Sequence, residues 1–281
     1  MQYLVLLVVV VLAAVSGATL VHRFPVLLAP GVMGRRLEWV RTLLRRARGR
    51  QPEPATAAGV FLAAAAVVAV AGGVVVTLLW LAIRDVAAVR HLDAGVARWG
   101  RAHATAASDT VMRRITDLGD TRDVLILGLL VAVVELLRRP NPWVLGYLAV
   151  APAGASAVCT AIKDLTHRVR PTVSAEAAHL GPSFPSGHSA TAAAFYGAVA
   201  LVLARGTGTG ERGAWAAAAC AIAAGVACTR VLLGVHWTSD VLAGLALGWA
   251  WWAVCTMAGG HRLLRVTLRR RRRLLEPGAH P

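Results

Sequence analysis

The feature that most constrains this chain is a series of long uncharged apolar blocks that recurs from its N-terminus to residue 258. Hydrophobic residues make up 57% of the chain and charged residues only 16%, whereas an ordinary soluble domain carries about 25% charged residues. This composition excludes a soluble enzyme, a disordered chain and a collagen-like fibre. Because about 20 apolar residues in a helix cross a bilayer, the blocks predict an all-α fold, a polytopic membrane helical bundle.

Six of these blocks predict the helices of one core, at 59–83, 124–137, 143–162, 189–204, 214–233 and 238–258. The second and fourth are shorter than a straight crossing requires, so we expect them to extend into flanking polar residues. The intervening residues 84–122 alternate apolar and charged positions, which indicates one or two short amphipathic helices at the interface.

The expected organisation has four parts. An extra N-terminal transmembrane anchor covers 1–22, and it is favoured over a cleaved signal because no basic residue precedes its apolar run. An Arg-rich cytoplasmic connector, either solvated or lying along the membrane surface, covers 23–58. The six-helix core covers 59–258, and a basic cytoplasmic tail covers 259–281.

The formal net charge of +16 first suggests a nucleic-acid partner, but the distribution of the arginines argues against one. Seven arginines lie in 35–50 and seven in 262–273, beside apolar blocks, where basic residues set topology and contact anionic lipid headgroups. We therefore expect membrane lipids as partners and no nucleic acid. If both clusters lie inside, the predicted topology also places five other arginines there, namely Arg23, Arg138, Arg139, Arg205 and Arg212. The cytoplasmic side of this cell-membrane protein then carries 19 of the 30 basic residues.

Three polar segments interrupt the apolar pattern, and the predicted topology brings all three to the outer face. They run from Lys163 to Pro171, from Pro185 to His188 and from Thr229 to Asp240. Ionisable residues that converge at the ends of membrane helices indicate a functional site. The four cysteines, in contrast, lie inside apolar blocks without paired spacing, so we expect neither a disulfide framework nor a zinc site.

The chemistry of these segments suits a phosphate group. They supply three cations, Lys163, Arg170 and Arg230, which match a multiply charged oxyanion. Ser186 and Gly187 immediately precede a predicted helix, where a serine can cap, a glycine permits close approach and free N–H groups bind anions.

Two imidazoles complete the set. His236 and Asp240 are four residues apart, so Asp240 can accept the His236 Nδ1–H and leave Nε2 as an uncharged nucleophile. His188 then serves as the general acid.

The spacing of these residues resembles the signature of the type-2 phosphatidic acid phosphatase superfamily, the lipid phosphate phosphatases. Its pattern is K-x6-R-P, P-S-G-H and S-R-x5-H-x3-D, and this chain departs from it only by Thr229 in place of Ser. The stretch from Ile115 to Gly119 also resembles the segment before the second core helix of that family, so that the resemblance covers about residues 59–258.

The resemblance implies a six-helix phosphatase core and an integral membrane lipid phosphatase that works through a phosphohistidine, with no cofactor and no metal. His236 is then the nucleophile, Asp240 its orienting base and His188 the acid. The phosphate-binding residues are Lys163, Arg170, Ser186, Gly187 and Arg230. Asp164, His167, Arg168 and His179 receive no role in this scheme and are expected to be solvated loop residues, with contact to the substrate as the alternative. His91 is expected to be structural or solvated.

Several alternatives remain open from the sequence. The substrate could be a phosphatidic acid-type lipid or a polyprenyl diphosphate such as undecaprenyl diphosphate, because the motifs address the phosphate and not the lipid tail. A membrane transporter, a catalytically inactive relative and a zinc hydrolase are the other functional classes considered. The oligomeric state is not readable from the sequence.

Overall fold

The computed structural model describes the backbone of residues 54–275 and, Thr209 apart, the side chains of 63–259. Within that range the chain forms eight α-helices, one short 3-10 helix and no strand. The six expected core blocks correspond to α3 (Pro54–Asp85), α6 (Thr121–Arg138), α7 (Trp143–Thr166), α8 (Gly187–Leu203), α9 (Thr209–Leu232) and α10 (Thr238–Leu275). The predicted all-α helical bundle is therefore confirmed.

The expected organisation can be compared with the structure only between residues 54 and 275. The predicted anchor at 1–22 and most of the connector at 23–58 lie outside the described residues. Helix α10 continues without a break to Leu275, so the boundary expected between core and tail at residue 258 falls inside a helix. The side chains of the tail arginines also lie outside the described part.

The helices have the length and surface of membrane-crossing segments. Four described helices are long and apolar enough to cross a bilayer, at Ala63–Asp85, Trp143–Thr166, Gly210–Leu232 and Thr238–Gly259. Helix α8 is apolar but has only 17 residues, and α6 reaches 18 by including charged residues at both ends, as expected for a short block. Large apolar side chains on α3 and α6, such as Val70 and Leu129, are exposed, which fits a surface in contact with lipid tails.

Helix α8 forms the centre of the bundle. Thirteen of its 17 residues are buried, and α6, α7, α9 and α10 all pack against it. Helix α10 approaches α8 closely because Gly244 and Gly248, one turn apart, face it: a Cβ at Gly248 would lie 2.3 Å from the Ala190 carbonyl oxygen. Small residues at this spacing allow membrane helices to pack backbone against backbone.

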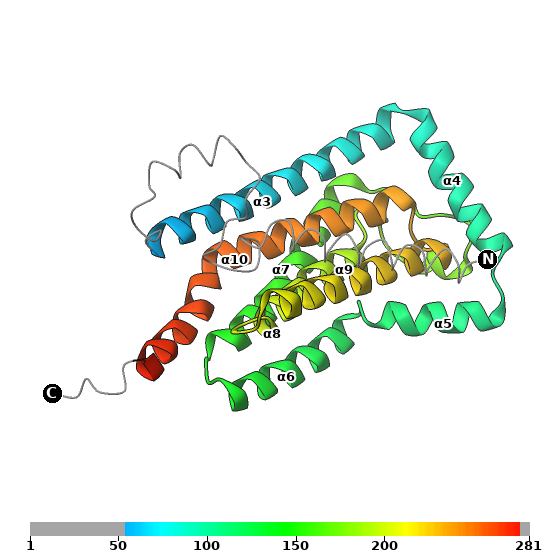
Figure 1. The fold of residues 1–281 in the computed structure, drawn as a ribbon. Coiled ribbons are helices and arrows are strands. Elements are labelled where there is room, and N and C mark those ends of the chain that lie inside the picture. The colour runs from blue at the N-terminus through cyan, green and yellow to red at the C-terminus, as the bar shows by residue number, and fades with distance from the viewer. Residues whose placement is uncertain (1–53, 276–281) are drawn as a thin grey trace.

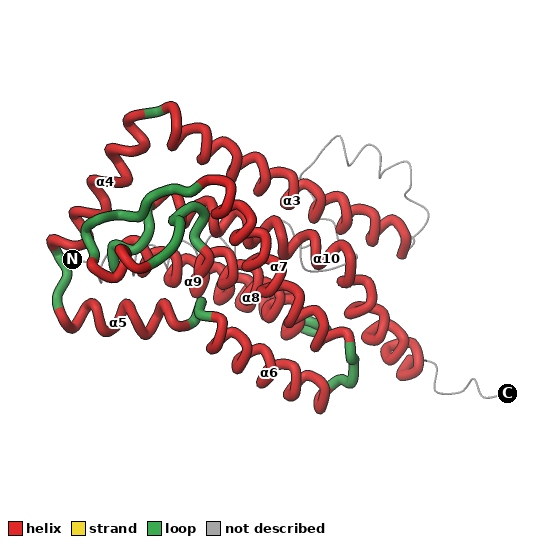
Figure 2. The backbone as a smooth tube through the Cα atoms, turned by 180° about the vertical axis from the view of Figure 1, so that it is seen from behind, coloured by secondary structure: helices red, strands yellow, loops and turns green. Residues whose placement is uncertain are grey.

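Two amphipathic helices, α4 (Ala87–Ala102) and α5 (Ala106–Asp117), cover one end of the bundle (Figure 1). They lie in the region for which one or two short helices were predicted. Figure 2 shows the long loop between α7 and α8, which includes the 3-10 helix η2 (Ala175–His179), at the same end. The three polar segments are therefore gathered at this end, as the topology predicted.

Candidate active site

The first polar segment is the end of α7 and the loop that follows, the second is the start of α8, and the third is the turn between α9 and α10. Helix α7 ends at Thr166, where His167 adopts a left-handed conformation with φ of 47°. The loop is then held in place by Ser183, whose N–H donates to the Arg168 carbonyl at 2.8 Å. The site is thus built from helix ends and from a loop that a backbone hydrogen bond holds in place.

The backbone of His236 is fixed by a tight turn. Helix α9 ends at Leu232, and Gly234 follows with φ of 69°, a conformation that favours glycine. The N–H groups of Val235 and His236 then both donate to the Arg230 carbonyl, each at 3.2 Å. The His236 side chain is only 2% exposed, so its ring has little freedom to reorient.

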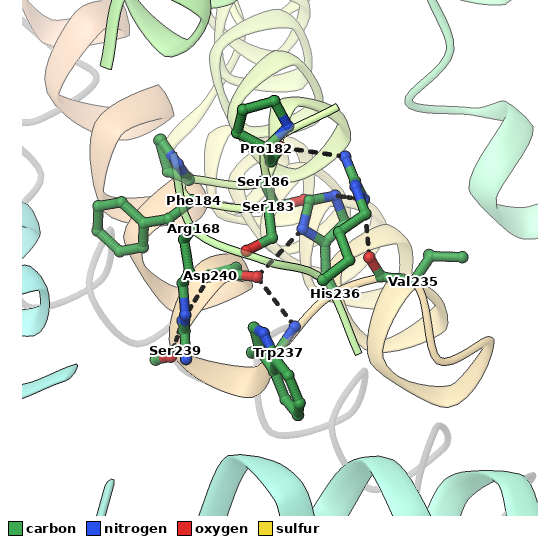
Figure 3. Close-up of polar contacts among 12 residues, drawn as sticks. Arg168, Pro182, Ser183, Phe184, Ser186, Val235, His236, Trp237, Ser239 and Asp240 are labelled. Carbon is green, nitrogen blue, oxygen red and sulfur yellow. Dashed lines mark hydrogen bonds and ion pairs between the residues drawn. The ribbon is translucent and has the colours of Figure 1, made fainter. Parts of the chain in front are cut away.

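The two ring nitrogens of His236 have partners that define their roles (Figure 3). Nδ1 lies 3.3 Å from Asp240 Oδ2, and Nε2 lies 3.0 Å from Arg170 Nη1. A guanidinium can only donate, so Nε2 must accept and the ring proton must be on Nδ1. This is the arrangement predicted from the spacing, although His236 precedes α10 and does not lie on its face.

Burial lowers the pKa of His236 to about 4. The hydrogen bond and the charge of Asp240 raise this pKa, while the nearby Arg170 and Arg230 cations lower it further. The net result is a neutral imidazole at physiological pH, which is the form a nucleophile requires.

Asp240 is completely buried and accepts from three sides. Its Oδ2 receives His236 Nδ1 and, at 3.0 Å, the N–H of Trp237. Its Oδ1 receives Arg168 Nη1 at 2.6 Å. A carboxylate held in this way has one orientation, and so does the imidazole it supports.

The three predicted cations lie near one another and near Asp240 or His236. Arg170 donates to the carbonyls of Gly181, Val235 and Pro182 as well as to the His236 ring. Lys163 Nζ also donates to the Pro182 carbonyl, at 2.9 Å.

The third cation, Arg230, is buried at 6% exposure. It donates to Thr116 Oγ1 on α5 at 3.3 Å, and its buried Nε has no hydrogen-bond partner among the described residues. This Nε–H group is therefore available to donate a hydrogen bond to a bound anion.

The start of α8 lies directly beside Asp240. Ser186 is the N-cap residue, and its N–H donates to the Asp240 carbonyl at 3.0 Å. The Ser186 side chain does not cap the helix as expected, because its hydroxyl instead accepts from Ser189 Oγ at 3.0 Å. Gly187 follows as the first helical residue, and the opening N–H groups of a helix have no partner within it.

His188 in the first turn of α8 lies close enough to interact electrostatically with Arg230 and His236. Its side chain is 30% exposed, and its Nε2 lies 3.9 Å from Oδ2 of Asp120, the N-cap residue of α6. The structure therefore brings His188 together with the other residues predicted from the motifs. The one departure from the pattern, Thr229, is buried and its hydroxyl donates to the Val226 carbonyl of its own helix.

Two residues of the site, Arg168 and Asp93, carry no motif that predicts their role. Arg168 was expected to be a solvated loop residue, and this expectation is wrong: its side chain is 10% exposed and ion-paired with both Asp240 and Asp93. Asp93 on α4 was not considered at all. Its position between apolar residues of an amphipathic helix gave a weak signal, because the partners that keep it buried are far away in the sequence.

The described residues contain no group of three or more His, Cys, Asp and Glu side chains arranged to hold a metal ion. The zinc alternative therefore has no ligand set within this part of the chain. Apart from Asp240, the charged groups that act on the His236 ring include the cations Arg170 and Arg230, which would repel a metal ion.

Comparison with known proteins identifies the family. The sequence profile of the PAP2 superfamily matches residues 144–262. A decaprenylphosphoryl-5-phosphoribose phosphatase of Mycobacterium tuberculosis is 37% identical over 145 residues, which are 49% of this chain and 72% of the relative. The chain belongs to the PAP2 superfamily.

Two further proteins are similar to this chain. The crystal structure of a transmembrane PAP2-type phosphatidylglycerolphosphate phosphatase from Bacillus subtilis matches with a TM-score of 0.63 and 26% identity, over 67% of this chain and 94% of the other. A lipid A 1-phosphatase of Rhizobium johnstonii is 49% identical over 74 residues, and the match spans 26% of each chain. The chain thus aligns with about a quarter of the length of that relative. All three relatives are named as phosphatases.

Proposed function

We propose that this PAP2 protein is an integral membrane phosphatase that removes phosphate from a lipid or lipid-linked phosphomonoester or diphosphate. The observation that carries the proposal is the His236 ring, whose Nδ1 is bonded to Asp240 while Nε2 faces Arg170. This is the geometry of a neutral nucleophile directed at an anion.

The proposed first step transfers the phosphoryl group to the enzyme. The phosphate displaces Arg170 Nη1 from Nε2, and Arg170 rebinds to a phosphate oxygen together with Lys163 and Arg230. The Nε2 lone pair forms a bond to phosphorus while the bond from phosphorus to the leaving oxygen breaks. His188 in its protonated form gives that oxygen a proton. Asp240 stabilises the imidazolium that forms on His236.

In the second step His188, now neutral, takes a proton from water as the water oxygen bonds to phosphorus. The bond between phosphorus and Nε2 breaks, its electron pair returns to nitrogen, and phosphate leaves. Burial and the nearby Arg230 and His236 lower the pKa of His188 to about 3. Asp120 and the charge of the bound phosphate both act in the opposite direction, and they must raise this pKa to give the protonated form that the first step needs. Three fixed cations supply the electrostatic stabilisation in both steps, so we expect turnover in the presence of EDTA.

The substrate class follows from the relatives and from the membrane setting. The names of the three relatives specify a lipid A phosphate, a decaprenyl-linked phosphoribose and phosphatidylglycerolphosphate. Each is a phosphate on a membrane-anchored molecule, and phosphatidic acid and undecaprenyl diphosphate share that description. We propose that the site lies on the outer face of the cell membrane.

The test is release of phosphate by the purified protein in detergent from a panel of these five substrates. We expect turnover of at least one substrate, and we expect His236→Ala to reduce it to background because the proposed covalent intermediate forms on this ring. His91→Ala is the matched control, since His91 is exposed on α4. A phosphoenzyme that is stable in alkali and labile in acid should be trapped in the native protein only. Phosphate release by folded His236→Ala would disprove the assignment of the nucleophile, and transport without hydrolysis would favour the transporter.

A further inference from the structure

Arg168 has contacts that the phosphatase scheme does not use. Its Nη1 donates to Asp240 Oδ1 at 2.6 Å and to Ser239 Oγ at 2.7 Å, and its Nη2 donates to Asp93 Oδ2 at 2.8 Å. The guanidinium carbon lies 5.5 Å from the centre of the Trp237 ring. Arg168 points away from Nε2 of His236 and toward the opposite side of Asp240 (Figure 3).

Asp93 completes this arrangement from a different part of the chain. It is 2% exposed on α4, and its Oδ1 accepts the N–H of Ser239 in the first turn of α10 at 3.0 Å. Its Oδ2 accepts from both Ser239 Oγ and Arg168. Helix α4 lies outside residues 144–262, to which the family profile applies. Asp93 thus accepts two hydrogen bonds from Ser239 at the start of α10. These bonds hold the start of α10, and with it Asp240, in place.

We propose that Arg168 and Asp93 are positioning residues, which fix Asp240 against His236 and form with them a row of alternating charges. The row runs from Asp93 through Arg168 and Asp240 to His236. The inference rests on the proposed function, because it assigns a role in setting the state of the nucleophile. Neither residue touches the substrate.

The charge balance of the row explains why both residues are needed. With His236 neutral, two carboxylates and one guanidinium leave the buried row with one net negative charge. Formation of the bond from Nε2 to phosphorus turns the imidazole into a cation, and the row then becomes neutral. The row therefore favours the intermediate over the resting state, while Arg168 limits how strongly Asp240 attracts a proton to His236 before the substrate arrives.

Other charged groups also act on His236 and remain unchanged in the variants below. Arg170 in the loop after α7, His188 on α8 and Arg230 on α9 act on His236 itself, and Lys163 on α7 acts on Asp240. Because this background is constant, a change in the titration of His236 on replacing Arg168 or Asp93 reports the row itself.

The two substitutions have opposite expected effects. Arg168→Gln leaves two buried carboxylates without their shared cation, so Asp240 holds a proton on His236 to higher pH. We expect the acid limb of kcat/KM to move up by about one pH unit and kcat to fall about 10- to 100-fold because Oδ1 loses its donor. Asp93→Asn removes a negative charge, so the acid limb should move down. Dividing each variant's rate by the native rate at every pH cancels the titration of the substrate.

Arg168→Lys tests whether geometry or charge is required. A lysine keeps the charge but cannot bridge Asp240, Ser239 and Asp93 with a planar fork. We expect Arg168→Lys to return the acid limb of kcat/KM toward its native pH while kcat stays low. If the substitutions only disturbed packing, the yield of folded protein would fall. The acid limb of kcat/KM would then not move in opposite directions in Arg168→Gln and Asp93→Asn.

NMR titration of His236 in detergent micelles, assigned with His236→Asn, gives a readout that does not depend on turnover. The proposal is supported if the pKa of His236 rises in Arg168→Gln and falls in Asp93→Asn. It is overturned if both variants titrate like the native protein. If the native protein hydrolyses no substrate but His236 titrates as expected, the proposed function fails and the row stands.

Discussion

At the scale of single residues, His236 can act as the proposed nucleophile at Nε2 in only one of its two neutral forms, and its neighbours select that form. Arg170 and Arg168 both only donate, one to Nε2 and the other to Asp240. The direction of every hydrogen bond between them is thereby fixed. Asp240 must accept on both oxygens, and His236 must carry its proton on Nδ1. A change at Asp240 should therefore act through the position of one proton.

Asp240→Asn tests this directly. We expect the amide oxygen to face Arg168, the charged and closer donor, at 2.6 Å. The amide NH₂ then takes the place of Oδ2, where it loses the hydrogen bond from the Trp237 N–H and faces His236 Nδ1. Nδ1 becomes an acceptor, the proton moves to Nε2, and the attacking lone pair is lost. We expect kcat to fall about 10³- to 10⁴-fold, with nitrogen chemical shifts of His236 showing the exchanged tautomer.

Asp164→Asn provides the matched control, because Asp164 is exposed at the end of α7 next to Lys163 and should keep native activity. Folded Asp240→Asn with more than about a tenth of native kcat would contradict the tautomer argument.

The residues that could be predicted from the sequence are those whose chemistry is local or has a fixed spacing. His236 and Asp240 are four positions apart, and Arg170 is seven positions after Lys163. Arg168 lies in the same loop, but its ion pairs with Asp93 and Asp240 join positions 75 and 72 residues away. Contacts over such separations depend on how α4 lies across the end of the bundle, and no local pattern encodes that.

At the scale of elements, the site depends on how closely α10 approaches α8, because the Ser186 N–H donates to the Asp240 carbonyl across that contact. The apolar blocks predicted both helices, but apolar composition does not say which faces meet. Gly244 and Gly248 decide it, because a Cβ at either would overlap the backbone of α8. The same contact that stabilises the bundle thus sets the distance between the start of α8, proposed to bind phosphate, and the Asp240 carboxylate.

Gly248→Ala should reduce stability for this reason. Its Cβ would lie 2.3 Å from the Ala190 carbonyl oxygen and 2.7 Å from Ala193 Cβ, both on α8. We expect a loss of about 1–3 kcal/mol, because neither atom belongs to a flexible side chain that could move aside. Thermal unfolding in detergent measures it. Gly73→Ala on α3 is the control, since nothing lies within 4 Å of its added Cβ. Equal melting temperatures for the two variants would show that the helices separate without cost.

At the scale of the whole molecule, the two ends of the bundle differ. One end holds the site beneath α4 and α5 (Figure 1). The other holds a buried ion pair between Glu135 and Arg205 at 2.6 Å, with Arg139 donating to the Arg205 carbonyl. Arg138 and Arg212 lie at this second end as well, and α10 continues there toward the arginines of its last turns. Residues 84–273 hold eleven basic residues toward each end. The expectation of an outward-facing site therefore rests on the eight arginines of 23–50, which the predicted topology adds to the second end, because basic residues concentrate at the cytoplasmic ends of membrane helices.

Labelling of single introduced cysteines tests this orientation. Thr172 is exposed in the loop between α7 and α8, and Gly208 is exposed between α8 and α9 at the opposite end. A membrane-impermeant maleimide should label Thr172→Cys in intact cells and Gly208→Cys only after the membrane is opened, because the reagent reaches the outer face alone. The native protein is the control: two of its four cysteines are buried and the other two half-buried. The reverse labelling pattern would place the site in the cytoplasm, where it could act only on lipids of the inner leaflet.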